Sequence, residues 1–109
     1  MRIFVVVVAL GSLSGIVCTA QARALTSHDR YICNWGSSVA GSAQAAKLSR
    51  VSLYGARNKV QARKYPQPWM RMMALGITEQ TYDSASRLKP AAVRQTYYED
   101  CIKHEMARR

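Results

Sequence analysis

The sequence predicts an all-α protein, a small bundle of four or five short helices closed by one disulfide between Cys33 and Cys101. After residue 24, apolar residues recur at helical spacing, and each run follows a residue type that favours a helix start. Nothing in this part of the chain resembles a strand pair, because its β-branched residues are scattered and it has no Asn-Gly or Asp-Gly turn. The two cysteines lie on the first and last expected helices.

Residues 1–22 have the pattern of a secretory signal peptide. Arg2 comes before a short apolar run, residues 3–10, and small residues follow near a cleavage site. We expect cleavage after Ala22, or after Ala24 at the overlapping site. The mature chain is then a single helical domain over residues 25–109, periplasmic or secreted.

Two alternatives to a cleaved signal peptide are weaker. An uncleaved membrane anchor requires about 20 consecutive apolar residues, whereas Gly and Ser residues interrupt this run between residues 11 and 15. Cys18 is a candidate for lipidation, but Val17 before it is larger than the residue expected there. We therefore predict no transmembrane segment in the mature chain.

Export also explains the cysteines of the mature chain, Cys33 and Cys101. Exported proteins fold in compartments that favour disulfides, and a domain of this size has a small core that benefits from one. Closing a loop that spans most of the mature chain stabilises by ~4 kcal/mol in the chain-entropy model. That figure approaches the whole stability of a small domain.

The first helix is expected to begin at Thr26 or Ser27, either of which can cap it, with Asp29 in the first turn. Its inward positions are apolar or small, and three of them are Gly or Ala, so a partner helix can approach closely. These positions are Ile32, Gly36, Ala40, Ala43 and the methylene stem of Lys47.

The second helix is expected over Leu53 to Tyr65, restarted by Ser49 or Ser52. Its apolar stripe is narrow and consists of Leu53, Ala56 and Val60. Pro66 ends it, because the residue before a proline is pushed out of helical geometry, and Pro68 suits the first position of a new helix.

A short third helix is expected over Trp69 to Leu75, with Gly76 as its left-handed end residue. Thr78 is then expected to cap a separate helix, and Ile77 before it would pack on Tyr82 as a hydrophobic staple. The last helix is expected to start at Pro90. Its apolar stripe is Val93, Tyr97 and Cys101, with Tyr98 and Ile102 beside it.

The expected architecture resembles small exported helical proteins of Gram-negative bacteria with one disulfide, such as the periplasmic acid-stress chaperones and some secretion-toxin immunity proteins. The resemblance covers the mature chain and depends on the two cysteines, the helices and the size. It implies no functional residue, because no sequence motif carries it.

Positive charge is the strongest functional signal. The 109-residue chain has 16 Lys and Arg residues against six Asp and Glu residues, a net charge of +10. Seven positive residues and no acid occur between residues 47 and 71: Lys47, Arg50, Arg57, Lys59, Arg63, Lys64 and Arg71. Tyr54, Tyr65 and Trp69 are interleaved with them. This pattern favours a non-enzymatic envelope or secreted protein that contacts an acidic protein or an anionic envelope surface, with nucleic acid as an alternative.

The alternative function is a small hydrolase-like enzyme or a metal-binding protein that uses His28 and His104. Both histidines together with Cys33 and Cys101 have the residue types of a zinc site, but the disulfide competes for the same sulfurs. Met70, Met72 and Met73 have the chemistry of Cu(I) ligands and are more typical of core filling. We therefore expect no catalytic residue, no metal and no cofactor.

Overall fold

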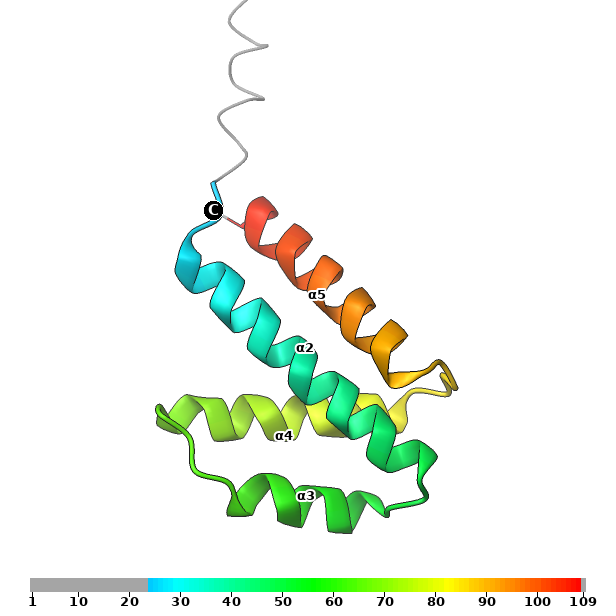
Figure 1. Ribbon diagram of the computed structural model, residues 1–109. Helices are drawn as coiled ribbons and strands as arrows, with labels where there is room; N and C mark the ends of the chain where they lie inside the picture. Colours follow the sequence, from blue (N-terminus) through cyan, green and yellow to red (C-terminus); the bar gives the residue numbers. More distant parts are fainter. Residues whose placement is uncertain (1–23, 109) are drawn as a thin grey trace, which may run out of the picture.

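The computed structural model describes residues 24–108, and over this range the chain is all-α, as predicted (Figure 1). Its four helices are α2 (Ser27–Leu48), α3 (Leu53–Ala62), α4 (Pro68–Asp83) and α5 (Pro90–Ala107). The predicted signal peptide lies outside the described residues.

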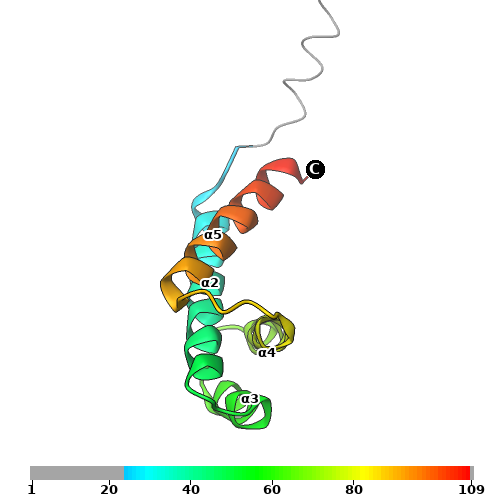
Figure 2. The ribbon, with the colours of Figure 1, turned by 90° about the vertical axis from the view of Figure 1, so that its right-hand side faces the viewer.

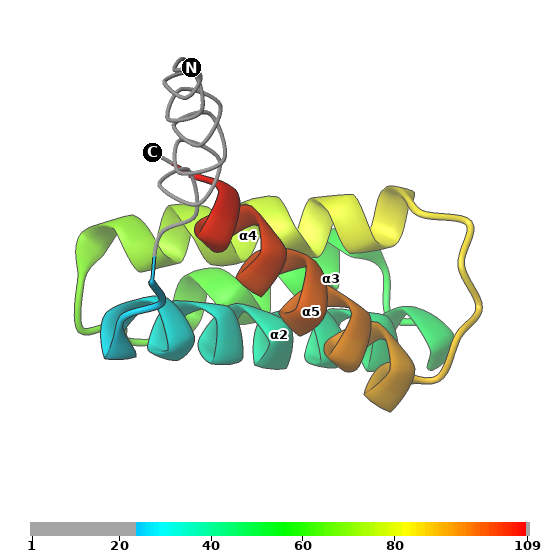
Figure 3. The ribbon, with the colours of Figure 1, turned by 90° about the horizontal axis from the view of Figure 1, so that it is seen from above.

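Helix α2 is central, since it packs against each of the other three helices (Figure 1). Helix α5 returns antiparallel to it, crossing obliquely when seen from above (Figure 3). Helix α4 runs in the same direction as α2: Trp69 near its start contacts Trp35, and Thr81 near its end accepts a hydrogen bond from Lys47. Helix α3 packs on α4, and both lie to one side of α2 (Figure 2).

The predicted start signals are confirmed at all four helices. Thr26 Oγ1 accepts from the Asp29 N–H at 3.0 Å, and the Asp29 carboxylate accepts from the Thr26 N–H at 3.0 Å, which is a capping box. Ser52 Oγ caps α3 by accepting from the Gly55 N–H at 3.0 Å. Pro68 and Pro90 open α4 and α5, where a missing N–H costs nothing.

The core is small and lies where α2, α3 and α4 meet. Its buried apolar cluster contains Val39, Ala40, Val60, Ala74 and Ile77. Half-buried side chains surround this cluster, including Trp35, Tyr65, Val93 and Tyr97. The small inward residues of α2 expected from the sequence, Gly36, Ala40 and Ala43, are buried.

The predicted disulfide between Cys33 and Cys101 is confirmed and joins α2 to α5, with 5.5 Å between the two Cα atoms. Cys33 is fully buried. Helix α5 has no buried residue anywhere along its described length. Val93 and Tyr97 of α5 pack half-buried against the core, so the disulfide adds a covalent link to a helix that is only partly buried.

The predicted helix break at Gly76 is wrong, because α4 is continuous from Pro68 to Asp83. Gly76 does not adopt a positive φ, and Thr78 does not cap a helix. The Thr78 hydroxyl instead donates to the Ala74 carbonyl at 2.8 Å, one turn back. Continuing the helix buries Ala74, Ile77 and Thr78 on one face, which outweighs the ~1 kcal/mol that an interior glycine costs.

The expected staple contact and the end of the second helix also differ from the prediction. The Tyr82 hydroxyl donates to the Val51 carbonyl at 2.8 Å, so Tyr82 ties α4 to the α2–α3 connection. Helix α3 ends at Ala62, three residues before Tyr65. Outside the helix, Tyr65 can pack its ring on Trp35 and donate its hydroxyl proton to the Val60 carbonyl at 2.7 Å.

Candidate functional site

Lys47, the first of the seven predicted basic residues, is engaged within the fold. Its ammonium donates to the carbonyls of Thr81 at 3.1 Å, Ser84 at 2.9 Å and Ser86 at 3.0 Å. These carbonyls lie at and beyond the end of α4, where the helix leaves acceptors without partners and carries partial negative charge. Lys47 therefore acts as a C-terminal cap for α4.

Arg57 is also partnered, by Glu79 across the α3–α4 interface. Both Nε and Nη2 of the guanidinium lie 2.8 Å from Glu79 Oε2. The two side chains are 40% and 49% exposed, so solvent screens the pair and its contribution to stability is small. The carboxylate nevertheless offsets the charge that Arg57 presents to a partner.

The five remaining basic residues lie in the α2–α3 connection, on α3, in the α3–α4 connection and on α4. We call them the basic surface: Arg50, Lys59, Arg63, Lys64 and Arg71. All five are exposed, and none is in an ion pair with a residue of the described range. The Arg71 guanidinium donates to the Arg63 carbonyl at 3.1 Å and lies 5.2 Å from the Tyr65 ring centroid. Arg71 is therefore held beside the α3–α4 connection.

Aromatic rings lie beside this connection, as the interleaved sequence pattern suggested. Trp35 makes edge-to-face contacts with Tyr65 and Trp69, each with ring centroids 6.4 Å apart. Trp69 remains 43% exposed. Tyr54, the third interleaved aromatic, is on α3 and largely exposed. Tyr65 and Trp69 thus lie with Arg63 and Arg71 at one end of the molecule.

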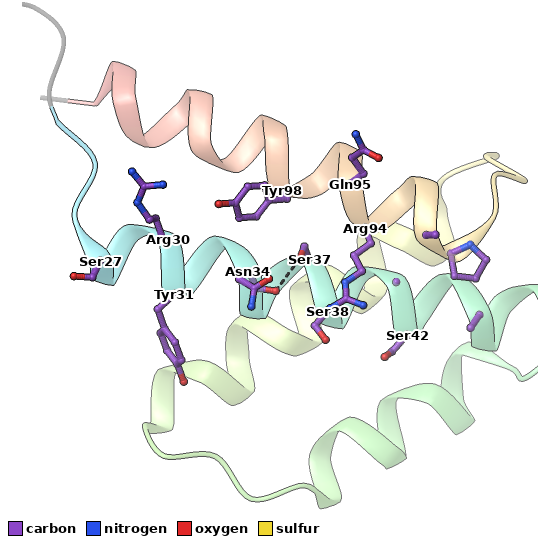
Figure 4. A pocket seen from close by; sticks show the side chains of 14 residues that line it. Ser27, Arg30, Tyr31, Asn34, Ser37, Ser38, Ser42, Arg94, Gln95 and Tyr98 are labelled. Carbon is purple, nitrogen blue, oxygen red and sulfur yellow. Dashed lines mark hydrogen bonds between the residues drawn. The ribbon is translucent and has the colours of Figure 1, made fainter.

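A second candidate site is a groove of about 870 Å³ between α2 and α5 (Figure 4). Hydroxyl and amide side chains line it, together with Arg30 and Arg94. Its lining residues, all within the described chain, include no carboxylate. The groove was not predicted. Asn34, Ser38 and Ser42 follow one another at four-residue spacing, which marks a polar helix stripe, but the sequence does not say which helix lies opposite.

The two histidines do not form a site with any described residue. The side chains of His28 and His104 are exposed and make no hydrogen bond or ion pair with any residue from 24 to 108. The disulfide uses both sulfurs of the alternative zinc site, and the described range contains no group of three His, Cys, Asp or Glu residues that could hold a metal.

The methionines differ in their surroundings. Met70 is buried in the core, Met73 packs half-buried against it, and Met72 points to solvent. Met70 and Met73 thus fill the core, which was the alternative to the copper-site interpretation.

No protein-family model, curated protein or solved structure matches this chain. Residues 24–108 form four helices, with one disulfide between α2 and α5, which is the coarse part of the predicted resemblance. Across residues 24–108, every helix is too short or too polar to cross a membrane.

Proposed function

We propose that this chain is a non-enzymatic binding protein that contacts an anionic partner through the basic surface. One observation carries the proposal: within the described range, five exposed cations have no counter-ion and no acid separates them in the sequence. Uncompensated charges of one sign sum to a potential that attracts and orients an oppositely charged partner.

The partner is an acidic protein or an anionic envelope surface, with nucleic acid as the alternative. The exposed part of Trp69 and the Tyr65 ring add flat apolar area beside the cations Arg63 and Arg71. Aromatic and Arg residues are enriched in protein interfaces, which supports a macromolecular partner.

A periplasmic or secreted location is part of the same proposal. The disulfide between Cys33 and Cys101 is consistent with an oxidising compartment. The predicted signal peptide provides the route to such a compartment. Binding is favoured over catalysis, because neither His28 nor His104 has a hydrogen-bond partner in the described range that could orient it as a base.

The test reverses charge in two matched places. In the first variant, Lys59, Arg63 and Lys64 all become Glu, which lowers the net charge of the full chain by six, from +10 to +4. The control variant changes Arg87, Lys89 and Lys103 to Glu, a loss of equal size at exposed positions outside the basic surface.

Binding of both variants and the parent is measured with anionic lipid vesicles, an acidic protein and a single-stranded oligonucleotide. The basic-surface variant should lose its partner while the control retains it. Parent binding should fall steeply as salt rises, since screening shortens from ~10 Å at 0.1 M to ~3 Å at 1 M. Equal binding by all three proteins, or equal loss in both variants, would reject the basic surface as the contact site.

A further inference from the structure

The groove between α2 and α5 has fixed walls. The disulfide clamps the helices near one end, between Cys33 and Cys101. Near the other end they approach closely at Gly41, where a Cβ atom would lie 3.4 Å from both the Pro90 carbonyl oxygen and the Arg94 Cβ. A volume of about 870 Å³ lies in the range of ligand-binding clefts. The groove is thus formed before any ligand arrives.

Its charge favours an anionic ligand. Arg30 extends from α2 towards α5, and Arg94 extends from α5 towards α2 (Figure 4). Both are exposed, and neither makes an ion pair or a side-chain hydrogen bond with any residue from 24 to 108. Two guanidinium groups without partners can each bind a carboxylate through paired hydrogen bonds.

The spacing of the two charges restricts the shape of that ligand. Arg30 and Gly41, beside which Arg94 packs, are eleven residues apart on α2, so their Cα atoms are separated by about 16 Å. Two side chains anchored so far apart engage two separate anionic groups more readily than one. An extended peptide covers this distance with about five residues.

The residues between the two cations are neutral and polar. Asn34, Ser38 and Tyr98 line the groove between Arg30 and Arg94 (Figure 4). Their hydroxyl and amide groups can both donate and accept, which suits the alternating N–H and C=O groups of a peptide backbone. A polynucleotide carries a phosphate at every residue and would place charges where the groove has no cation.

We propose that the α2–α5 groove binds an extended acidic peptide segment, with Arg30 and Arg94 each holding one of two carboxylates about five residues apart. This site uses none of the basic surface, so it adds a second binding site to the proposed function. A partner protein with an acidic extended tail or loop fits such a groove.

Two capped hexapeptides of equal composition test the spacing. Glu-Ser-Gly-Ser-Gly-Glu has carboxylates five residues apart, whereas Glu-Glu-Ser-Gly-Ser-Gly has them adjacent. Each is titrated into the isotope-labelled protein and followed by NMR. The first peptide should bind at least about fivefold more tightly, and the amide signals of residues 30–42 and 90–98 should shift. Equal affinity, or shifts confined to residues 50–71, would overturn the proposal.

Matched variants separate this groove from the basic surface. Arg30→Gln with Arg94→Gln should weaken binding of the spaced peptide by about tenfold or more, since each change removes a charged hydrogen-bond donor. Arg63→Gln with Lys64→Gln removes the same charge and should leave peptide binding within about twofold. Equal weakening by both pairs would show a non-specific charge effect and overturn the groove.

A capped hexathymidylate serves as the competing ligand. The oligonucleotide could displace the spaced peptide, bind more tightly than it does, and lose this binding only in the Arg30→Gln, Arg94→Gln variant. The groove would then be a nucleic-acid site, and the peptide proposal would be wrong. Binding of anionic lipid vesicles should be unchanged in the Arg30→Gln, Arg94→Gln variant, because vesicles are proposed to contact the basic surface. The two proposals can therefore fail separately.

Discussion

The ring of Tyr97 lies directly on the backbone of Gly36, so that a Cβ atom at Gly36 would be 2.8 Å from Tyr97 Cε1 and 2.9 Å from its hydroxyl oxygen. Gly36→Ala should therefore destabilise the protein by ~1–3 kcal/mol, although alanine is the better helix former. Urea unfolding measures the change. In a Tyr97→Ala background the same substitution should become neutral or stabilising, and a persistent cost there would show that Tyr97 is not the cause.

Gly76 gives the opposite expectation within α4. No heavy atom beyond its own stretch of helix lies within 4 Å of the position that a Cβ would take, and its φ is not positive. Gly76→Ala should thus raise the free energy of unfolding by ~0.5–1 kcal/mol. A loss of stability in urea unfolding would mean that the helix does break at Gly76.

The disulfide should account for a large share of the stability. Cys33→Ala with Cys101→Ala removes a link across 68 positions of sequence and should lower the free energy of unfolding by ~4 kcal/mol. Thermal unfolding of the parent with and without reductant should show a loss of similar size. Two alkylatable thiols in freshly isolated native protein would contradict the bridge.

Lys47 should be structural rather than a binding residue. Lys47→Met keeps most of the stem but leaves the carbonyls of Thr81, Ser84 and Ser86 without their ammonium donor, which should cost ~1–3 kcal/mol. Lys59→Met makes the same chemical change at an exposed position and should stay within about ±0.5 kcal/mol. Chemical unfolding of the two variants measures both changes. Equal changes in the free energy of unfolding would show that the Lys47 cap does not stabilise the fold.

Stability should fall at alkaline pH because two phenols are partly buried. Burial raises the pKa of Tyr97 above the value of about 10 for a solvated tyrosine, and burial also raises the pKa of Tyr82. The folded state thus holds these protons more tightly than the unfolded state. Their contribution to stability is complete below pH ~10 and is lost as the pH rises through the folded-state pKa.

Tyr97→Phe should therefore flatten the decline in unfolding free energy above pH ~10, whereas Tyr54→Phe, at a largely exposed position, should leave the parent's decline unchanged. Urea unfolding at a series of alkaline pH values compares the variants. Identical slopes for both would assign the decline to other groups.

Local signals predicted four helix starts correctly and a fifth, at Thr78, wrongly. Thr26, Ser52, Pro68 and Pro90 each begin a helix where the sequence places it, because a cap or a proline acts on backbone groups within one turn of itself. The Gly76 signal failed for the same reason. A glycine permits a left-handed helix end but does not require one. Burial of Ala74 and Ile77 against other helices favours the continuous helix, and a local sequence pattern does not show that burial.

The candidate site was predictable in composition and not in layout. The sequence shows seven cations without an acid, yet two of them are partnered by groups distant in the chain: Lys47 by carbonyls 34 to 39 residues away, and Arg57 by Glu79. The α2–α5 groove shows the same limit, since its two cations are 64 positions apart in the sequence, at Arg30 and Arg94.

By itself the sequence determined the helical class, four helix starts and the pairing of Cys33 with Cys101, since capping chemistry acts locally and the third cysteine, Cys18, falls in the predicted signal peptide. Tertiary structure decided that α4 is continuous, which cations remain exposed, and that a groove opens between α2 and α5. These features depend on which surfaces meet. Burial and long-range hydrogen bonds act between residues that are neighbours only after the chain has folded, so no local pattern encodes them.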